Sequence, residues 1–453
     1  MKIVIVGGGK VGIELVRLLS GEEHDVTVID TAPKLIETIV NDNDVIGYCG
    51  NGASFPVQEE AGVAKCDIFI AVTGSDELNI MSCMVASKVG AKKTVARVRN
   101  TDYSGQLLFM QNKLGIDLVI NPEFETALEI SRILAFPAAT AIETFAKGRI
   151  DLAQITVTED SPLNKLKLSS IKSKLDTPLL ICAVQRGEEV FIPTGNFVIK
   201  AGDKLHFTAA RHDLSAVFKA LGIKRKKVKS VLIIGGSRTS YYLALYLLKL
   251  GKKVKIIESD FNRASELEGL LDGADIVCAD GTDTDILLEE GLTGFDATVA
   301  LTDMDEENII FSLYASGQGV GKTVCKVNRG HLTGMVGAIM PDCSVICPKT
   351  NTASIILRYI RALSNADGSP IETLYKILES RAEAVEFIAD ENCPINDVPL
   401  KNLKLKEGVI IACVSRGKNV IIPDGNTVVE KGDSVIVITA GQTVYDLKEI
   451  LEQ

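Results

Sequence analysis

A glycine-rich loop near the start of the chain has the spacing of a phosphate-binding turn. Gly7, Gly9 and Gly12 form the pattern G-x-G-x-x-G directly after the β-branched run Ile3–Val6 and directly before a helical stretch that begins at Ile13. In this pattern the first glycine makes the tight turn, the second lets the backbone approach a pyrophosphate, and the third lets the helix pack on the strand. The following helix N-terminus offers N–H groups and partial positive charge to phosphates. The loop therefore predicts a pyrophosphate site.

An acidic residue follows at the distance that a ribose contact requires. Asp30 lies eighteen residues after Gly12, at the end of the second β-branched run. A carboxylate at this position accepts hydrogen bonds from ribose hydroxyls, whereas NADP sites place an arginine nearby for the 2′-phosphate. Asp30 therefore favours NAD(H) or an adenosine nucleotide over NADP.

Further candidates lie where later strands should end, since open α/β sheets bind ligands at the carboxyl ends of their strands. Thr73 and Gly74 end the fourth expected strand and could contact the second ribose or its base, although Thr73 could simply terminate the strand. Arg97 ends the fifth and could reach a phosphate, with a surface ion pair as the alternative. Asp76 and Glu77 are interpreted as acids that cap the next helix.

The elements that must position these residues occur twice in the chain. Three segments of the first half recur in the second at offsets of 228 to 230, namely 2–8 as 230–236, 73–80 as 302–309, and 186–203 as 416–433. Offsets this steady indicate a duplication. The two halves meet at the charged run 224–229, which we interpret as a solvated linker rather than a nucleic-acid contact.

Each half divides into a larger and a smaller lobe. Short Val/Ile-rich runs alternate with helical stretches over about the first 120 residues of a half, which predicts a βαβ series and a parallel sheet. The last 75 or so residues read instead as hairpins around Arg-Gly and Gly-Asp turns. The predicted fold class is therefore α/β, with two tandem Rossmann-like doubly wound parallel sheets, each followed by a small α+β lobe. The expected boundaries are a first sheet domain at 1–122, a connecting helix at 123–150, a small domain at 151–225, and their counterparts at 226–348, 349–380 and 381–453.

Composition narrows the class of function. Lys and Arg number 49 against 59 Asp and Glu, a net charge of 49 − 59 = −10, which argues against a nucleic-acid partner. No apolar run approaches the ~20 residues of a spanning helix, so we expect a cytoplasmic protein. The ten cysteines form no C-x-x-C pair, and those in apolar runs, including Cys66 and Cys278, are expected as buried reduced thiols.

A catalyst is not recognisable in the sequence. Hydride transfer needs a general acid or base beside the nicotinamide, yet the four histidines, His24, His206, His212 and His331, show neither a nucleophile partner nor metal-ligand spacing. A dinucleotide site without a visible catalyst, in a duplicated module, indicates a sensor rather than an enzyme. The alternative is an NAD-dependent dehydrogenase or reductase whose catalytic residue is unrecognised.

These motifs together resemble the RCK (KTN) domain family in its two-copy form. The resemblance rests on the GGGKVG loop with Asp30, the T-x-x-D-E-x-N-I segment and the R-G … P-x-G … G-D small lobe, and it covers essentially the whole chain. It implies a peripheral regulatory subunit on the inner face of the cell membrane, forming a homo-oligomeric ring below a separate integral-membrane potassium transporter of the Trk type. Binding of NAD(H), with ATP or ADP as alternatives, would change the ring and gate potassium uptake. Gating of an efflux channel by the same domains is a further reading, which the absence of a fused pore helix disfavours.

The resemblance also implies which residues contact the dinucleotide. By position these are Gly7, Gly8, Gly9, Lys10, Val11, Asp30, Thr73, Gly74 and Arg97. Asn51 departs from the family, where an acid is common at this position and where the second half keeps Asp280. Asn51 could border the adenine or simply make a turn.

The second half keeps the scaffold but has a looser loop. After Gly235, Ser237 and Ser240 replace the second and third glycines, and their extra atoms should obstruct a pyrophosphate. Glu258 takes the place of Asp30, so ribose binding in this half stays open.

Overall fold

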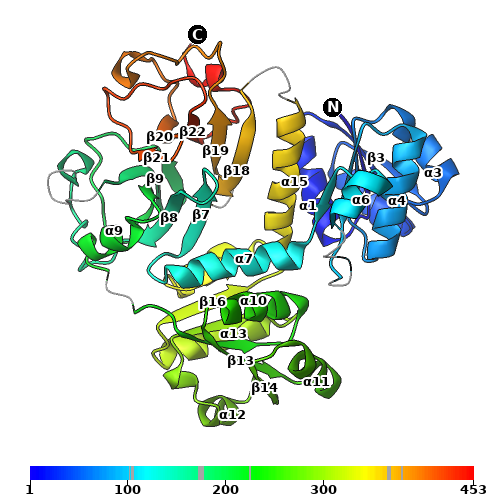
Figure 1. Cartoon of the computed structure of the whole chain (residues 1–453), viewed down its shortest axis with the longest axis horizontal. Helices are drawn as coiled ribbons and strands as arrows, with labels where there is room; N and C mark the ends of the chain where they lie inside the picture. Colours follow the sequence, from blue (N-terminus) through cyan, green and yellow to red (C-terminus); the bar gives the residue numbers. More distant parts are fainter. Residues whose placement is uncertain are drawn as a thin grey trace. The chain divides into compact units, whose positions relative to one another are not determined.

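The computed structural model describes residues 1–100, 103, 107–171, 178–223, 226–364, 369–378 and 381–452 (Figure 1). Lys224 and Arg225, with which the predicted linker begins, lie outside the described residues. The chain folds into two compact units, the first made of residues 1–126 and 347–360 and the second of 127–346 and 361–453. Each is described by itself below.

The first sheet lobe alternates strands with helices. Its elements are β1 (Lys2–Val6), α1 (Lys10–Ser20), β2 (Asp25–Asp30), α2 (Pro33–Asp42), β3 (Ile46–Cys49), α3 (Phe55–Glu60), β4 (Ile68–Ala71), α4 (Asp76–Val89), β5 (Lys93–Arg97), α6 (Leu107–Leu114) and β6 (Leu118–Ile120). The strands are parallel, in the order β3-β2-β1-β4-β5-β6. Strand order reverses between β1 and β4, which is where such sheets bind nucleotides. All four residues of β4 are buried, as expected for a strand covered by helices on both faces.

The second sheet lobe repeats this plan. Its elements are β12 (Ser230–Ile234), α10 (Arg238–Lys249), β13 (Lys253–Glu258), α11 (Phe261–Leu270), β14 (Asp275–Cys278), α12 (Thr284–Glu289), β15 (Ala297–Ala300), α13 (Asp305–Gly317), β16 (Lys322–Lys326), α14 (Leu332–Ile339) and β17 (Ser344–Ile346). These strands are also parallel, in the equivalent order β14-β13-β12-β15-β16-β17. The duplication predicted from the sequence is therefore a duplication of topology.

Each small lobe is built on a five-stranded antiparallel sheet. The first consists of β7 (Ala141–Phe145), β8 (Ile150–Thr156), β9 (Leu180–Arg186), β10 (Glu189–Phe191), β11 (Lys204–Ala210) and α9 (Leu214–Ala220), and the second of β18 (Ile371–Ile377), β19 (Ala382–Ile388), β20 (Val409–Arg416), β21 (Asn419–Ile421) and β22 (Ser434–Ala440). Residues of both sheets share one apolar core, in which the rings of Phe145 and Tyr375 lie edge to face at 5.2 Å. The predicted α/β fold class is confirmed.

The connecting segments are helical only in their first part. Helix α7 (Pro122–Ala135) ends before Phe136-Pro137, and α15 (Pro348–Ser364) ends well short of residue 380. The helix expected over 123–150 is thus too long, because proline cannot continue a helix and the chain then enters β7. Likewise β18 occupies 371–377 of the second expected segment.

The two connecting helices contribute to different units. In the second unit, Ala127, Ile130, Ile133 and Leu134 of α7 belong to the core of the second sheet lobe. In the first unit, the part of α15 up to Ile360 joins the first sheet lobe, where Figure 1 shows it beside α1 and Lys349 Nζ lies 3.8 Å from Glu14 Oε2.

The ten cysteines are all unpaired thiols, but they are not all buried. Cys66 is buried, as the sequence predicts, and burial raises the pKa of its thiol to about 12. Cys278 is exposed, contrary to that prediction, because it ends β14 at the edge of its sheet. Among the described helices none is both long and apolar enough to cross a membrane.

Candidate nucleotide-binding site

Two of the three motif glycines are required by the protein's own packing, and one is not. Gly7 has φ +102°, and a Cβ on it would lie 2.9 Å from the backbone nitrogen of Thr73. A Cβ on Gly12 would lie 1.9 Å from the carbonyl oxygen of Gly7, so this glycine allows α1 to pack on the strand. Gly9 has an ordinary φ of −69°, and apart from Gly9 and its two chain neighbours no atom of the described chain lies within 4 Å of its would-be Cβ. A glycine that neither conformation nor packing explains fits close approach by a ligand.

Replacing Gly12 with alanine should therefore destabilise the fold. The added methyl group overlaps a backbone oxygen that cannot move without displacing the turn, and such overpacking costs about 1–3 kcal/mol. Thermal or urea unfolding of Gly12→Ala against the unchanged chain measures this. Unchanged stability would mean that α1 and the turn separate more easily than the structure indicates.

The N-termini of the two equivalent helices differ in their caps. Helix α1 begins after Gly9 with no side-chain cap among the described residues and no acid in its first turn. Helix α10 begins after Ser237, whose hydroxyl accepts a hydrogen bond from Ser240 N, while the Ser240 hydroxyl donates to Gly235 O. The first-turn N–H groups of a helix need acceptors. In α10 a serine supplies one, whereas no described side chain supplies one at the start of α1.

Asp30 is positioned by the loop that it is predicted to serve. Its Oδ2 accepts from Gly8 N at 2.7 Å and its Oδ1 from Ala32 N at 2.9 Å. Each carboxylate oxygen retains a second lone pair for a ribose hydroxyl. Glu258 makes the same tether in the second half, accepting from Gly236 N and, at 2.8 Å, from Asp260 N.

The remaining loop residues have different surroundings. Lys10 is exposed at the first position of α1, whereas the Val11 side chain is 8% exposed and belongs to the core. Val11 can therefore contribute only its backbone to a ligand. Asn51 follows β3, and its Oδ1 accepts from Ala53 N at 2.9 Å. This local hydrogen bond agrees with the interpretation of Asn51 as a turn residue.

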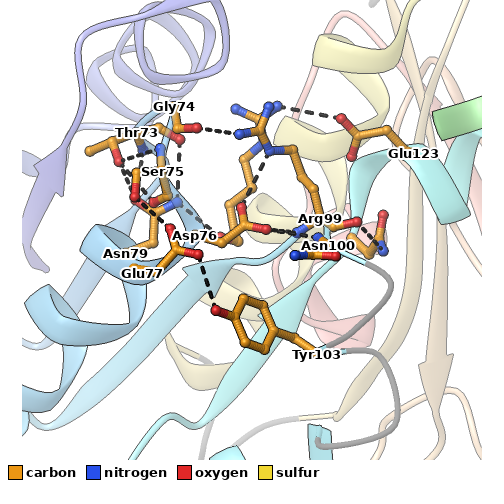
Figure 2. Close-up of polar contacts among 12 residues, drawn as sticks. Thr73, Gly74, Ser75, Asp76, Glu77, Asn79, Arg99, Asn100, Tyr103 and Glu123 are labelled. Atoms are coloured by element: carbon orange, nitrogen blue, oxygen red, sulfur yellow. Dashed lines mark hydrogen bonds and ion pairs between the residues drawn. The ribbon is translucent and has the colours of Figure 1, made fainter. Parts of the chain in front are cut away.

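Thr73 is part of a clamp between the ends of β4 and β5. Its backbone nitrogen and hydroxyl both donate to Asn79 Oδ1, at 2.8 and 2.7 Å (Figure 2). Asn79 Nδ2 in turn donates to Arg97 O at 2.9 Å. Thr302 and Asn308 form the same clamp in the second half. The recurring T-x-x-D-E-x-N segment is therefore structural in both halves, and Asn79, which sequence reasoning did not single out, is its buried centre.

Asp76 does not cap α4 as the sequence suggested. Ser75 is the cap, accepting from Leu78 N, and Asp76 instead accepts from the backbone nitrogens of Arg99 and Asn100 at 2.8 and 2.7 Å. This holds the segment after β5 against the sheet edge. The Arg99 side chain also contacts Asp76 and donates to Gly74 O. This hydrogen bond holds the carbonyl group of Gly74. The residue itself is exposed to solvent at the end of β4.

Glu77 is likewise held by specific donors. A hydrogen bond from its own backbone N–H, then those from the Ser75 and Tyr103 hydroxyls, lower the pKa of Glu77. The Tyr103 hydroxyl lies 3.0 Å from the carboxylate (Figure 2). Glu77 therefore carries a stable negative charge at the exposed start of α4.

Arg97 lies at the edge predicted to bind phosphate and is paired in this structure. Its Nη2 lies 3.7 Å from Glu123 Oε1 in the first turn of α7, and the two side chains are 17% and 19% exposed. The ion pair that the sequence analysis gave as the alternative role of Arg97 is therefore present, with Glu123 as its partner. The counterpart in the second half is Lys326, 8% exposed, whose Nζ lies 3.4 Å from Asp303 Oδ1.

No group of three or more His, Cys, Asp or Glu side chains in the described part of the chain could hold a metal ion. What the structure brings together at the β1–β4 switch point is Gly9 with the uncapped start of α1, Asp30 to one side, and Thr73, Gly74 and Arg97 to the other. This set can bind phosphates and ribose hydroxyls.

Comparison with known proteins identifies the family. The TrkA-N domain matches residues 3–122 and 231–334, and the TrkA-C domain matches residues 152–222 and 384–452. The chain belongs to the TrkA family. The Trk system potassium uptake protein TrkA homolog of Archaeoglobus fulgidus is 31% identical over 99% of this chain and 100% of its own. TrkA of Haemophilus influenzae is 29% identical over 96% and 95%.

Solved structures share the fold of this TrkA-family chain at low sequence identity. The GsuK RCK domain matches with a TM-score of 0.62 at 17% identity, covering 97% of this chain and 92% of that one. The GsuK channel bound to NAD also matches with a TM-score of 0.62 at 17% identity, covering 97% and 77%. The resemblance to RCK domains drawn from the sequence is confirmed.

Proposed function

We propose that this chain is a non-enzymatic, nucleotide-sensing regulatory subunit of a Trk-type potassium uptake system. In this proposal it lies in the cytoplasm, assembles into a homo-oligomeric ring and docks on an integral-membrane transporter subunit. It binds NAD(H) in its first half, with ATP or ADP as competing ligands, and gates the membrane subunit by a conformational change. The observation that carries nucleotide binding is Gly9. Neither its φ nor a contact among the described residues requires a glycine there, and it stands at the start of α1, which no described side chain caps.

Relatives and structural neighbours support the parts of this proposal separately. The curated relatives are named as potassium uptake proteins of the Trk system, which supports transport of potassium and a membrane partner. GsuK is described as a channel and has been solved with NAD and with ADP. Those ligands fit the donor and acceptor set around Gly9 and Asp30.

Each residue of the site has a definable task in binding. The backbone N–H groups at the start of α1 would donate to the pyrophosphate, with Lys10 adding positive charge. Asp30 would accept from ribose hydroxyls, and Thr73 and Gly74 would border the ligand on the β4 side. A ligand shifts a conformational equilibrium only through its different affinities for the two states. Here the helices α7 and α15, which follow the last strand of each sheet lobe, would differ between those states.

Alanine at Asp30 should weaken NADH binding about tenfold or more, since a hydrogen bond to a charged group contributes roughly 1.5–3 kcal/mol. Titration calorimetry of the full chain with NADH measures the effect. Glu258→Ala is the matched control because it removes the same tether in the second half, and it should leave the affinity within about twofold. Equal loss from both variants would contradict a site confined to the first half. Unchanged affinity in Asp30→Ala would contradict the assignment of Asp30.

A sensor and a dehydrogenase differ in turnover. Incubating the chain with NAD and a panel of small alcohols and hydroxy acids should produce no NADH absorbance at 340 nm above the protein-free control. Steady NADH production would contradict the sensor hypothesis and favour a dehydrogenase.

A further inference from the structure

The second sheet lobe carries a group of lysines at the edge where its strands begin. In a parallel sheet this amino edge lies opposite the carboxyl edge, where ligands of such sheets bind. The group, which we call the amino-edge cluster, consists of Lys226, Lys227, Lys229, Lys249, Lys252 and Lys253. Two hydrogen bonds join the segment before β12 to the segment before β13, from Lys253 N to Lys229 O at 2.9 Å and from Lys252 Nζ to Val228 O at 2.5 Å. The lysines therefore form one surface.

The charge of this cluster is only partly compensated. Five of the lysines are exposed, and Lys252 is half-buried. The acids at the neighbouring strand starts have other contacts. Asp296 Oδ2 accepts from the backbone nitrogens of Lys229 and Ser230 at 2.8 and 3.1 Å, and Asp275 Oδ2 lies 2.9 Å from Lys255 Nζ. The cluster therefore retains a positive surplus, whose self-repulsion an anionic partner would relieve.

The same edge of the first sheet carries the opposite charge. Asp25 pairs in register with Lys2 as Lys253 pairs with Ser230, so Asp25 occupies the position of Lys253. Glu22 and Glu23 precede it in the sequence. Because both sheets have the same topology, the fold itself does not require lysines at this edge. A basic edge in only one half of a chain with net charge −10 indicates an anionic partner for that half.

An exposed apolar side chain lies within the cluster. Helix α10 ends at Lys249, and Leu250, which follows it, is 55% exposed. Tyr246 lies four residues earlier on the same face of the helix and is 39% exposed. Gly251 then turns the chain toward β13 with φ +70°. A leucine surrounded by lysines suits a lipid surface, where the apolar side chain enters the boundary of the acyl chains and the long lysine side chains extend to the headgroups.

We infer that the amino-edge cluster docks the second sheet lobe on an anionic phospholipid surface. The lysine ammonium groups donate to the headgroup phosphates, and Leu250 enters the membrane interface beside them. This contact goes beyond the proposed function, in which the chain meets the membrane only through a transporter subunit. An acidic protein segment would use the lysines but would have no need of Leu250, so the leucine favours the lipid.

Sedimentation with vesicles of equal parts phosphatidylglycerol and phosphatidylcholine tests the inference. The full chain should bind these vesicles but not vesicles of phosphatidylcholine alone, and added salt should weaken binding because it screens exposed charges. Glutamine in place of Lys226, Lys227, Lys249 and Lys253 together should lower the partition coefficient at least a hundredfold, since each lysine near an anionic surface contributes about fivefold. Leu250→Gln should lower it about tenfold through the lost apolar contact.

The matched control removes the same charge elsewhere. It replaces four other exposed lysines with glutamine, namely Lys88, Lys167, Lys219 and Lys418, and vesicle binding should stay within about twofold. Thermal unfolding should show that every variant is folded. Equal losses in the control and the cluster variant, or no preference of the unchanged chain for anionic vesicles, overturn the inference.

A soluble polyanion separates lipid from an acidic protein segment. If the unchanged chain binds polyglutamate as tightly as it binds anionic vesicles, and Leu250→Gln weakens neither, the cluster serves an acidic protein segment and the inference fails. NADH titrations of the same samples report on the proposed function separately. Their affinities should not change with the cluster variant, because the cluster lies in the other half of the chain from the proposed nucleotide site.

Discussion

Serine in place of Gly9 should lower the affinity for NADH about a hundredfold, because the lost charge-assisted contacts to a pyrophosphate contribute roughly 3 kcal/mol. The stability of the fold should not fall. A Cβ at this position meets no atom of the described chain beyond its own chain neighbours, and in the second half Ser237 caps α10 from the equivalent position. Serine is at least as good a cap as glycine, with a difference of a few tenths of a kcal/mol. Calorimetric titration and thermal unfolding of the same sample measure the two effects.

Ser237→Gly makes the opposite change and serves as the control. It should leave NADH affinity within about twofold and lower stability by a few tenths of a kcal/mol. If instead Ser237→Gly altered binding and Gly9→Ser did not, the nucleotide would occupy the second half. A Gly9→Ser chain that unfolds more easily would mean that Gly9 is needed for folding, contrary to the open surroundings of its would-be Cβ.

The fold was predictable because its signals are local and repeated. The Val/Ile-rich runs, the glycine turn and the offsets between halves each specify a βαβ plan, and the two sheets follow it strand for strand. Contacts between segments distant in sequence were not predictable. Residues 347–360 belong with the first sheet lobe, and the sequence does not predict this. The apolar face of a helix indicates that it is covered, but not which surface covers it.

The candidate site was predictable where a residue's backbone role is fixed by its type. Gly7 and Gly12 have the roles that their positions in the motif require, and Asp30 lies against the glycine loop. Asp76 was misassigned because an acid at the start of a helix can either cap that helix or accept hydrogen bonds from backbone N–H groups far away in the sequence. Its true donors, Arg99 and Asn100, are 23 and 24 residues away. Both halves contain an Asp followed by an Asn three residues later. This repeat was the signal from which a shared structural role could have been inferred.

The glycine loops of the two halves differ in one helix-capping acceptor and share their scaffold. In the second half, burial opposes ionisation of Asp305, but hydrogen bonds from Asn328 and Arg329 outweigh it and lower the pKa of Asp305. The strand-end clamp and its buried carboxylate are thus retained there. What differs is the helix start, where Ser237 accepts from an N–H group that no described side chain satisfies in α1. The same scaffold therefore accommodates both a capped and an uncapped helix start among the described residues.

Methionine in place of Arg361 should destabilise the second unit by about 3–5 kcal/mol, the cost of leaving one member of a buried ion pair without its partner. Arg361 is fully buried in the last turn of α15 and binds Glu383 with both ends of its guanidinium, at 2.7 and 3.0 Å. Its guanidinium carbon also lies 5.2 Å from the centroid of the Tyr445 ring. Methionine restores much of the lost volume, so the loss reports the removal of the guanidinium from Glu383, which keeps only the more distant Lys376 among the ion pairs of the described residues, rather than a cavity. Urea unfolding measures it, and a change below about 1 kcal/mol would contradict a tight buried pair.

A double variant separates charge from packing at this position. Arg361→Met combined with Glu383→Leu removes both charges, and well-packed apolar replacements of buried ion pairs are often neutral or stabilising. Most of the stability lost in Arg361→Met should therefore return, while Lys376, 14% exposed and 3.5 Å from Glu383, can turn its ammonium toward water. If the double variant is as unstable as the single one, shape rather than charge governs this joint between α15 and β19. Recovery would show instead that Glu383 accounts for the burial of an arginine at the end of the connecting helix.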